Sequence, residues 1–410
     1  MNPFNSHPFK WLALSWLNVI RNTRRSLIST GIIALGSLAL LLAAGYVAAT
    51  FEGLRESTIQ GGLGHLQIAP QNAFNDREAD LQGLSPEHTA EIETQLNTMP
   101  EVRLTTRRVL FEGLVSSGDI TIAAMGRGVD IANERKISVF SPIVEGRNLS
   151  RHDDPYTAVL GERLAKHLKI NIGDSVTVLA TTRYQGINAI DVTVVGLNRS
   201  GIPELDERFI MMPLAAAQVL TDSEQVNRIV VALHDTADTD TIAERTRTLE
   251  NTSTRTWGEL FPFYQAVVTL YKNIFGVMGG IIFVVVFLSV TNTMVMVIME
   301  RVNESGTLRA YGFSRTRVIG LFTREGAILG VAGALIGLMI GSILILLINS
   351  AMIQMPPPPG RSTGYPLVLN WELLAVLGIF ITMSLCGALA AWFPARKMTR
   401  LSITHALNHF

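Results

Sequence analysis

The chain has 410 residues, and its 34 basic and 34 acidic side chains give a formal net charge of zero at pH 7. Nucleic-acid-binding proteins usually carry a basic excess, so this balance argues against that function. Apolar residues make up 48% of the chain and charged residues only 17%, against about 25% charged in soluble globular proteins. These values exclude a disordered chain and disfavour an ordinary soluble enzyme. The one cysteine, Cys386, excludes an intrachain disulfide and a cysteine-based metal cluster.

The N-terminal residues 1–26 predict an amphipathic helix that lies in the membrane interface on the cytoplasmic side. Apolar side chains recur there at the spacing of one helix face: Phe9, Leu12, Ala13, Trp16, Leu17 and Ile20. A cleavable signal peptide is the alternative. Its apolar region has about 7–15 residues, whereas 26 uncharged residues separate Arg25 from Glu52. The greater length favours a retained first span.

Three further charge-free runs follow: 27 residues between Lys272 and Glu300, 35 residues over 326–360, and 23 residues between Glu372 and Arg396. A membrane-spanning helix needs about 20 mostly apolar residues, so all four runs qualify. The sequence therefore predicts an α-helical membrane protein with spans at 27–51, 267–299, 325–353 and 372–395.

The short flanks of these spans predict the orientation in the membrane. Residues 1–26, 299–325 and 394–410 carry net charges of +4, +2 and +3, which leaves −9 for the rest of the chain. Basic flanks stay in the cytoplasm. We therefore expect the N-terminal residues 1–26, the segment 300–324 and the tail 396–410 on the cytoplasmic side. Residues 52–266 and the loop 354–371 then lie outside.

The outer segment 52–266 is long and patterned enough to be a folded domain. Strands are expected at 64–68, 102–115, 228–233 and 252–256, and helices at 85–99 and 238–250. Short apolar runs and turn residues in between predict a small β-rich subdomain at about 120–222. The expected fold is therefore a large α+β domain inserted between the first and second membrane helices.

The motifs of common enzymes and nucleotide-binding proteins do not occur in this sequence. It holds no G-x-x-x-x-G-K-[ST], no G-x-S-x-G and no H-E-x-x-H. His405 and His409 lie four residues apart, but zinc sites need three or four protein ligands, so no metal site is predicted. The four charge-free runs also hold no Asp, Glu, Lys, Arg or His, which argues against an ion or proton pathway.

Two groups of residues in or near the spans have a candidate role. Glycines in the third span have the small-residue spacing that lets helices pack closely: Gly326, Gly330, Gly333, Gly337 and Gly341. Aromatic residues gather near the outer ends of the first two spans: Phe51, Phe261, Phe263, Tyr264 and Tyr271. The aromatic residues can contact acyl chains or a partner, or form an interfacial belt, which is the simpler explanation.

The run over 300–315 closely resembles the pattern E-R-x-x-E-x-G-x-L-R-A-x-G-x-[ST]-R. That pattern is typical of the FtsX-like permease module of ABC transporters in the MacB, LolC/LolE and FtsX superfamily. The tail 394–407 is similar to the P-A-x-x-A-x-x-x-x-P-x-x-A-L ending of that family, with Met398 and Ile403 in place of the usual Ala and Pro. Residues 11–25, 145–147, 159–165 and 172–176 also resemble its other motifs.

The resemblance implies an ATPase partner and a complex with two permease subunits. A dimer of separate cytoplasmic ABC ATPase subunits binds ATP and Mg²⁺, and this chain itself holds no cofactor. A second permease subunit completes a homo- or heterodimer in the lipids of the bacterial inner membrane. Contact with the ATPase is expected at the cytoplasmic segment, where Gly306 and Gly312 permit a sharp entry and exit, through Glu300, Glu304, Gly306, Arg309, Gly312 and Arg315.

Three functions follow from the resemblance, none of them catalytic in this chain. The first is lipoprotein release or lipid handling with a periplasmic lipoprotein carrier, because residues 64–68 and 201–206 look like the LolC/LolE branch. The second is MacB-type efflux of a peptide, toxin or drug with a membrane-fusion adaptor. The third is FtsX-like regulation of a cell-wall hydrolase by the outer domain.

Overall fold

The computed structural model describes residues 15, 18, 21, 23–75, 81, 83–138, 142–152, 154–355 and 365–400. The apolar face expected over Phe9–Ile20 and the tail from residue 401 lie outside these residues. The chain divides into two compact units with boundaries at Phe51/Glu52, Ala266/Val267, Gln354/Met355 and Tyr365/Pro366. We call the first the helical unit and the second, which contains residues 52–266, the inserted domain.

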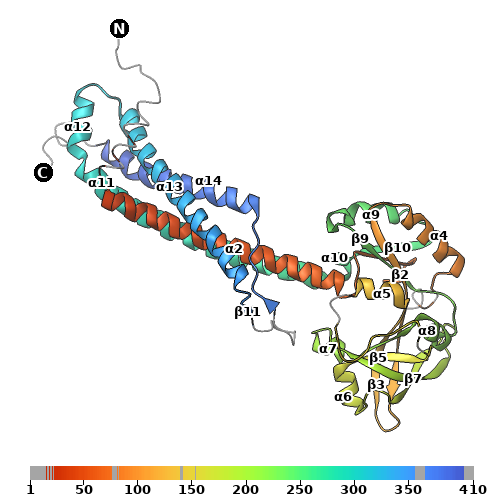
Figure 1. Cartoon of the computed structure of the whole chain (residues 1–410). Helices are drawn as coiled ribbons and strands as arrows, with labels where there is room; N and C mark the ends of the chain where they lie inside the picture. Colours follow the sequence, from red (N-terminus) through yellow and green to blue (C-terminus); the bar gives the residue numbers. More distant parts are fainter. Residues whose placement is uncertain are drawn as a thin grey trace. The chain divides into compact units, whose positions relative to one another are not determined.

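Four long apolar helices dominate the helical unit (Figure 1). They are α2 (Thr23–Gln60), α11 (Pro262–Glu300), α13 (Arg315–Ser350) and α14 (Leu373–Met398). Each is long and apolar enough to cross a membrane. The predicted fold class, four membrane helices with a large domain between the first and second, is confirmed. Three of the helices run well past the predicted spans because their polar ends also form regular helix.

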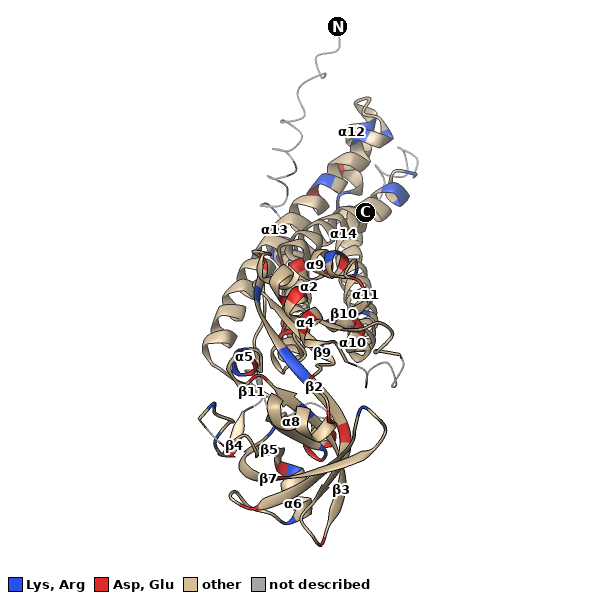
Figure 2. Cartoon of the chain, turned by 90° about the vertical axis from the view of Figure 1, so that its right-hand side faces the viewer, with Lys and Arg blue, Asp and Glu red and all other residues tan. Residues whose placement is uncertain are grey.

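The helices pack through a core that all four share. Ile33 of α2, Val286 and Val290 of α11, Leu329 of α13 and Cys386 of α14 are all buried in it. Figure 2 shows few charged residues along these helices and several basic ones near α12 (Val302–Ala310), the short helix between α11 and α13. Between α13 and α14, two short strands, β11 (Gln354–Met355) and β12 (Tyr365–Pro366), pair with each other.

One part of the inserted domain is an antiparallel sheet in the order β10-β1-β9-β2. Its strands are β1 (Leu66–Pro70), β2 (Val102–Ser116), β9 (Arg228–Leu233) and β10 (Thr252–Thr256). Helices α4 (Pro86–Asn97) and α9 (Thr239–Thr246) accompany these strands. Ser85 caps α4 by accepting from the backbone N–H of His88, and proline occupies the first turn, as the sequence predicts.

The other part is a closed barrel. Strand β2 pairs with β3 (Thr121–Val129), and the ring continues through β8 (Phe209–Pro213), β5 (Thr157–Gly161), β7 (Ile187–Asn198) and β6 (Ser175–Thr181) back to β2. Strand β4 (Ile143–Gly146) pairs with β7 outside this ring. Closure leaves none of the ring strands with a free edge. The remaining short helices are α5 (Ile131–Ile137), α6 (Glu162–Leu168), α7 (Pro203–Asp206), α8 (Leu214–Thr221), η1 (Thr236–Asp238) and α10 (Trp257–Leu260).

The structure differs from the predicted subdivision in one respect. The β-rich subdomain was expected at about 120–222, but the barrel also uses β2, which begins at Val102. The first half of β2 pairs with β9 and its last residues pair with β6, so one strand belongs to both parts. Buried side chains of both parts also form one core, which includes Ile68 and Val178. A local pattern cannot reveal that a strand serves two sheets, because pairing partners lie far away in the sequence.

Candidate functional site

The connection from α11 through α12 to α13, which we call the elbow (residues 300–325), is the candidate site. Helix α11 ends at Glu300, and Arg301 is the residue before α12. After α12, Gly312 adopts a positive φ of 90°, a left-handed conformation that glycine reaches without steric cost. Its N–H donates to the Arg309 carbonyl, and the Phe313 N–H donates to the Leu308 carbonyl. The chain can therefore leave α12 sharply and start α13 at Arg315.

One side of α12 is fixed to the helical unit by apolar packing. Val302 is 1% exposed and lies in a cluster with Ile298 of α11, Val318 and Phe322 of α13 and Ala395 of α14. The opposite side points to solvent: Asn303, Thr307, Ala310 and Tyr311 are exposed, Tyr311 at 81%. A large aromatic side chain left in solvent beside a rigid base is typical of an interaction surface.

Arg301 connects α12 and α13 within the elbow through its side-chain contacts. Its Nε donates to Glu304 at 2.7 Å, its Nη1 donates to Glu325 at 2.9 Å, and its guanidinium lies 5.2 Å from the centre of the Phe322 ring. Arg301 and Glu325 are 8% and 5% exposed. A buried charge costs several kcal/mol unless it is paired, so removal of Arg301 would leave the buried Glu325 carboxylate without its arginine. The pair therefore holds the start of α12 against α13.

The N-terminal residues contact the same elbow through a polar stripe. Asn18 Nδ2 donates to Glu325 at 2.6 Å, Arg21 pairs with Glu304 at 2.8 Å, and Arg25 pairs with Glu300. These residues recur at about one helical turn, so they share one helix face. Sequence reasoning assigned the apolar face of this segment to the membrane and counted its basic residues toward the orientation, but gave them no partners in the chain. Its polar side chains at residues 18, 21 and 25 contact α13, α12 and the end of α11, respectively.

The Glu304 carboxylate is held in its ionised form. Burial opposes its charge, but the hydrogen bonds from Arg301 and Arg21 outweigh that effect and keep its pKa below the usual value. Glu304 thus stays negative at neutral pH and bridges the N-terminal residues and Arg301. The elbow is a network of paired charges around one buried arginine, not a set of independent surface charges.

The structure brings the six predicted elbow residues into one connected segment, but their settings differ. Glu300 and Glu304 are engaged in ion pairs, Arg309 is half-buried in the last turn of α12, and Arg315 is exposed as the first residue of α13. The expectation for Gly306 is wrong: it lies in the middle of α12, so it does not open a sharp entry. The prediction missed Arg301 and Glu325 as the buried pair, although both lie within the quoted run and its continuation.

The predicted aromatic mouth forms two separate groups of ring contacts. In the helical unit, Phe51 lies 6.1 Å from Tyr271, and Phe275 lies 6.0 Å from Tyr271 and 6.2 Å from Tyr46. In the inserted domain, Phe261 contacts Phe263 at 5.7 Å and Tyr264 contacts Trp257 at 4.8 Å. The first group joins α2 to α11, and sequence reasoning missed its members Tyr46 and Phe275.

The five glycines of α13 face two different helices. A Cβ at Gly326 or Gly330 would come within 2.4 and 2.8 Å of the carbonyl oxygens of Gly387 and Ser384 in α14. At Gly337 it would meet the Ala34 carbonyl of α2 at 2.2 Å, and Gly333 and Gly341 also face α2, at Ile33 and Leu41. In this structure the stripe serves contacts within one chain.

Among the described residues, no cluster of three or more His, Cys, Asp and Glu side chains is placed to hold a metal ion. His405 and His409 lie in the tail that the structure does not describe.

Family models match most of the chain in two blocks. A model described as MacB-like periplasmic core domain matches residues 26–249, and one described as FtsX-like permease C-terminal matches residues 276–403. The first block spans α2 and most of the inserted domain. The second contains the elbow and the helices α13 and α14.

Individual relatives agree with these models at low identity. The chain is 22% identical to the lipoprotein-releasing system transmembrane protein LolC of Haemophilus influenzae, over 94% of this chain and 93% of the relative. It is 20% identical to the macrolide export ATP-binding/permease protein MacB of Campylobacter jejuni, over 98% of this chain and 61% of the relative. It is 26% identical to an uncharacterised ABC transporter permease of Methanocaldococcus jannaschii over 65% of each, which is less than two thirds of that relative's length.

Proposed function

Because the chain belongs to the family of ABC transporter permeases with a MacB-like periplasmic core domain and an FtsX-like permease module, we propose that it transmits ATP-driven motion. The motion starts in a partner ATPase and ends in the inserted domain. The observation that carries the proposal is the elbow. Helix α12 is rigidly held on one side by Val302 and the Arg301–Glu325 pair and exposes the other side. Such a helix can carry a push from a docked partner into α11 and α13.

The partner in this proposal is a dimer of cytoplasmic ABC ATPase subunits that binds ATP and Mg²⁺. It docks on the exposed side of α12, around Tyr311 and the half-buried Arg309. Aromatic and arginine side chains carry a large share of the binding energy at protein interfaces. The chain itself positions and transmits, and the chemistry of ATP hydrolysis stays with the partner.

The proposed setting is the inner membrane of a bacterium, with both termini and the elbow in the cytoplasm and the inserted domain in the periplasm. The basic flanks of the spans support this orientation. A second permease subunit, identical or related, completes the complex.

For the cargo we propose lipoprotein release or lipid handling at the outer face of the membrane. The alignment with the Haemophilus influenzae LolC, which covers nearly the full length of both chains, supports this. The aromatic group of Tyr46, Phe51, Tyr271 and Phe275 adds an apolar surface between α2 and α11. A periplasmic lipoprotein carrier would then receive the cargo at the inserted domain.

The second candidate is efflux of MacB type with a membrane-fusion adaptor, because the alignment with the Campylobacter jejuni MacB covers 98% of this chain. The third is FtsX-like regulation of a cell-wall hydrolase, which the FtsX-like module supports more weakly. The proteins captured by the full-length complex separate these functions: a lipoprotein carrier favours the first, an adaptor the second and a hydrolase the third.

The coupling role is tested by Tyr311→Asp. The change places a charge on the exposed side of α12 and spares the buried base, so the protein should fold and reach the membrane. We expect at least a tenfold loss of co-purifying ATPase and of ATP turnover per permease. Tyr184→Asp is the matched control, because Tyr184 is 76% exposed on the turn between β6 and β7 of the inserted domain. Wild-type ATPase recovery and turnover with Tyr311→Asp would refute docking at the elbow.

A further inference from the structure

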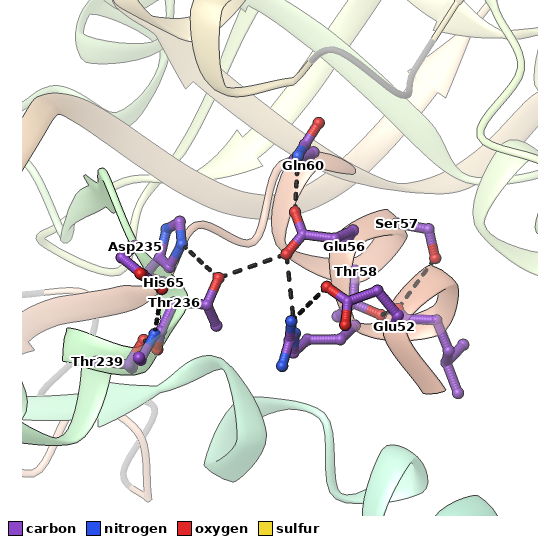
Figure 3. A network of polar contacts seen from close by, with 12 residues as sticks. Glu52, Glu56, Ser57, Thr58, Gln60, His65, Asp235, Thr236 and Thr239 are labelled. Atoms are coloured by element: carbon purple, nitrogen blue, oxygen red, sulfur yellow. Dashed lines mark hydrogen bonds and ion pairs between the residues drawn. The ribbon is translucent and has the colours of Figure 1, made fainter. Parts of the chain in front are cut away.

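The outer end of α2 is tied to the inserted domain by a chain of polar contacts that the elbow does not involve (Figure 3). Glu56 lies in the last turns of α2, His65 lies just before β1, and Thr236 begins the short helix η1 after β9. His65 is 7% exposed and Thr236 is half-buried. All three belong to the inserted domain, while α2 continues without a break into the helical unit.

The donor and the acceptor of each hydrogen bond from Leu233 through His65 and Thr236 to Glu56 follow from the groups involved. The backbone N–H of Leu233 lies 3.2 Å from His65 Nδ1, and an N–H can only donate, so Nδ1 is the unprotonated nitrogen. The proton of the neutral ring therefore sits on Nε2, which lies 3.2 Å from Thr236 Oγ1. The Thr236 hydroxyl in turn donates to Glu56 Oε1 at 3.4 Å. Thr236 is the member that connects the sheet to the helix.

Neighbouring side chains hold the Glu56 carboxylate in place. Gln60 donates to the second carboxylate oxygen of Glu56 at 2.7 Å, and Arg55 lies 3.8 Å from the first. An open pocket of about 360 Å³ lies beside the chain, and the charged groups Glu52, Arg55, Arg103 and Asp235 face it together with His234. Glu56 thus has fixed neighbours on α2, and among the described residues Thr236 joins it to the β9–η1 connection.

A second attachment holds the turn that follows α2. The carbonyl of Gly62 accepts from Arg108 of β2, and Arg108 pairs with Glu134 of α5 at 2.7 Å, both side chains almost fully buried. Gly64 has a φ of +73°, and a Cβ there would approach Val230 of β9 to 2.3 Å. The end of α2 is therefore fixed by the turn at Gly62. One helical turn earlier, Glu56 is joined to the inserted domain through Thr236.

We propose that Thr236 is a positioning residue that transmits movement of α2 to strands β1 and β9 through its hydrogen bonds to Glu56 and His65. With the end of α2 fixed at Gly62, a tilt of the helix displaces Glu56 sideways. Thr236 passes this displacement to His65 and, through the Leu233 N–H, to the end of β9. The role rests on the proposed function, since it requires that α2 moves when the partner hydrolyses ATP.

The test uses the full chain in complex with its co-purified ATPase in lipid nanodiscs. Amide hydrogen exchange of peptides from β1, β9 and η1 is measured with and without ATP, and the difference between the two states is the readout. Thr236→Val keeps the shape of the side chain but removes the hydroxyl, and Thr236→Ser is the matched control that keeps it. A purely structural role would alter exchange equally in both states and leave the difference unchanged.

We expect Thr236→Val to reduce the ATP-dependent difference to less than half of the wild-type value, with ATP turnover preserved. Thr236→Ser should retain it, and Glu56→Ala, which removes the other end of the link, should reproduce the loss. A wild-type difference in Thr236→Val and in Glu56→Ala would overturn the role of Thr236. A wild-type complex that hydrolyses ATP without any difference in these peptides would instead overturn the proposed function.

Discussion

Two buried ion pairs give single residues a large influence on this chain. Arg301 with Glu325 anchors α12 in the helical unit, and Arg108 with Glu134 anchors the turn after α2 in the inserted domain. Loss of Arg301 would leave the buried Glu325 carboxylate without its arginine, which costs about 3–5 kcal/mol. Loss of Arg108 would leave Glu134 with one charged partner among the described residues, the more distant Arg127 at 3.6 Å. Arg108 and Arg301 therefore hold the turn after α2 and the start of α12 in place.

His65 predicts a pH dependence of stability. Burial lowers the pKa of this imidazole to about 4, against about 6.5 in an unfolded chain. The unfolded chain therefore binds a proton between about pH 6.5 and 4, where the native chain does not, so stability falls as pH falls through this window. We expect a loss of roughly 2 kcal/mol or less, because partial solvent access screens the effect.

Thermal unfolding of the wild type and of His65→Gln between pH 4 and 7.5 measures this contribution. Gln is uncharged, so it cannot take up a proton on unfolding, and its pH-dependent loss of Tm should be smaller than that of the wild type. Identical slopes for the two proteins would show that His65 does not titrate as its buried position requires.

At the level of single residues, the sequence pattern identifies the elbow but does not show that Arg301 is its central residue. The motif run contains Arg301, yet exposure and burial of neighbouring charges look alike in a sequence. Only the packing of α11, α13 and α14 shows that Arg301 and Glu325 point inward while Tyr311 points outward. Gly306 and Gly312 illustrate the same limit, since only Gly312 adopts a positive φ.

Helix α13 packs closely against α2 and α14 at its glycines. A methyl group at Gly337 would meet the Ala34 carbonyl at 2.2 Å, whereas one at Gly320 in the same helix would meet nothing within 4 Å. Overpacking of this kind typically costs about 1–3 kcal/mol. In open space, Ala is favoured over Gly in a helix by up to about 1 kcal/mol.

Gly337→Ala should therefore lower the unfolding temperature of the protein in nanodiscs, and Gly320→Ala should leave it unchanged or raise it slightly. Intrinsic tryptophan fluorescence during heating measures both variants under identical conditions. A Gly337→Ala protein as stable as Gly320→Ala would contradict the close packing of α13 against α2.

Long charge-free runs predict the four membrane helices well, because the bilayer demands that composition along the whole length of a span. The barrel is a different case. Its closure depends on β2 pairing with β6, whose partners, such as Leu114 and Leu179, are far apart in the sequence. The division of the glycine stripe between α14 and α2 is equally invisible, since periodicity shows a packing face but not its partners.

For the whole molecule, the distribution of charge along the chain predicts an orientation in the membrane. The zero net charge combines basic flanks of the spans with a negative remainder. A reporter that fluoresces only in the cytoplasm should give no signal when fused after Ser200 and a strong signal when fused after Phe410. Signal from the Ser200 fusion would place the inserted domain in the cytoplasm and remove the basis for a periplasmic output.

In the proposed mechanism, a change of nucleotide state in a partner ATPase reaches the inserted domain through this chain. Amide hydrogen exchange of the wild-type complex in nanodiscs, with and without ATP, tests it most directly. We expect ATP to change the exchange of peptides from α12 and also of peptides from β1 and β9. A complex that hydrolyses ATP and responds at α12, while β1 and β9 exchange identically in both states, would contradict it.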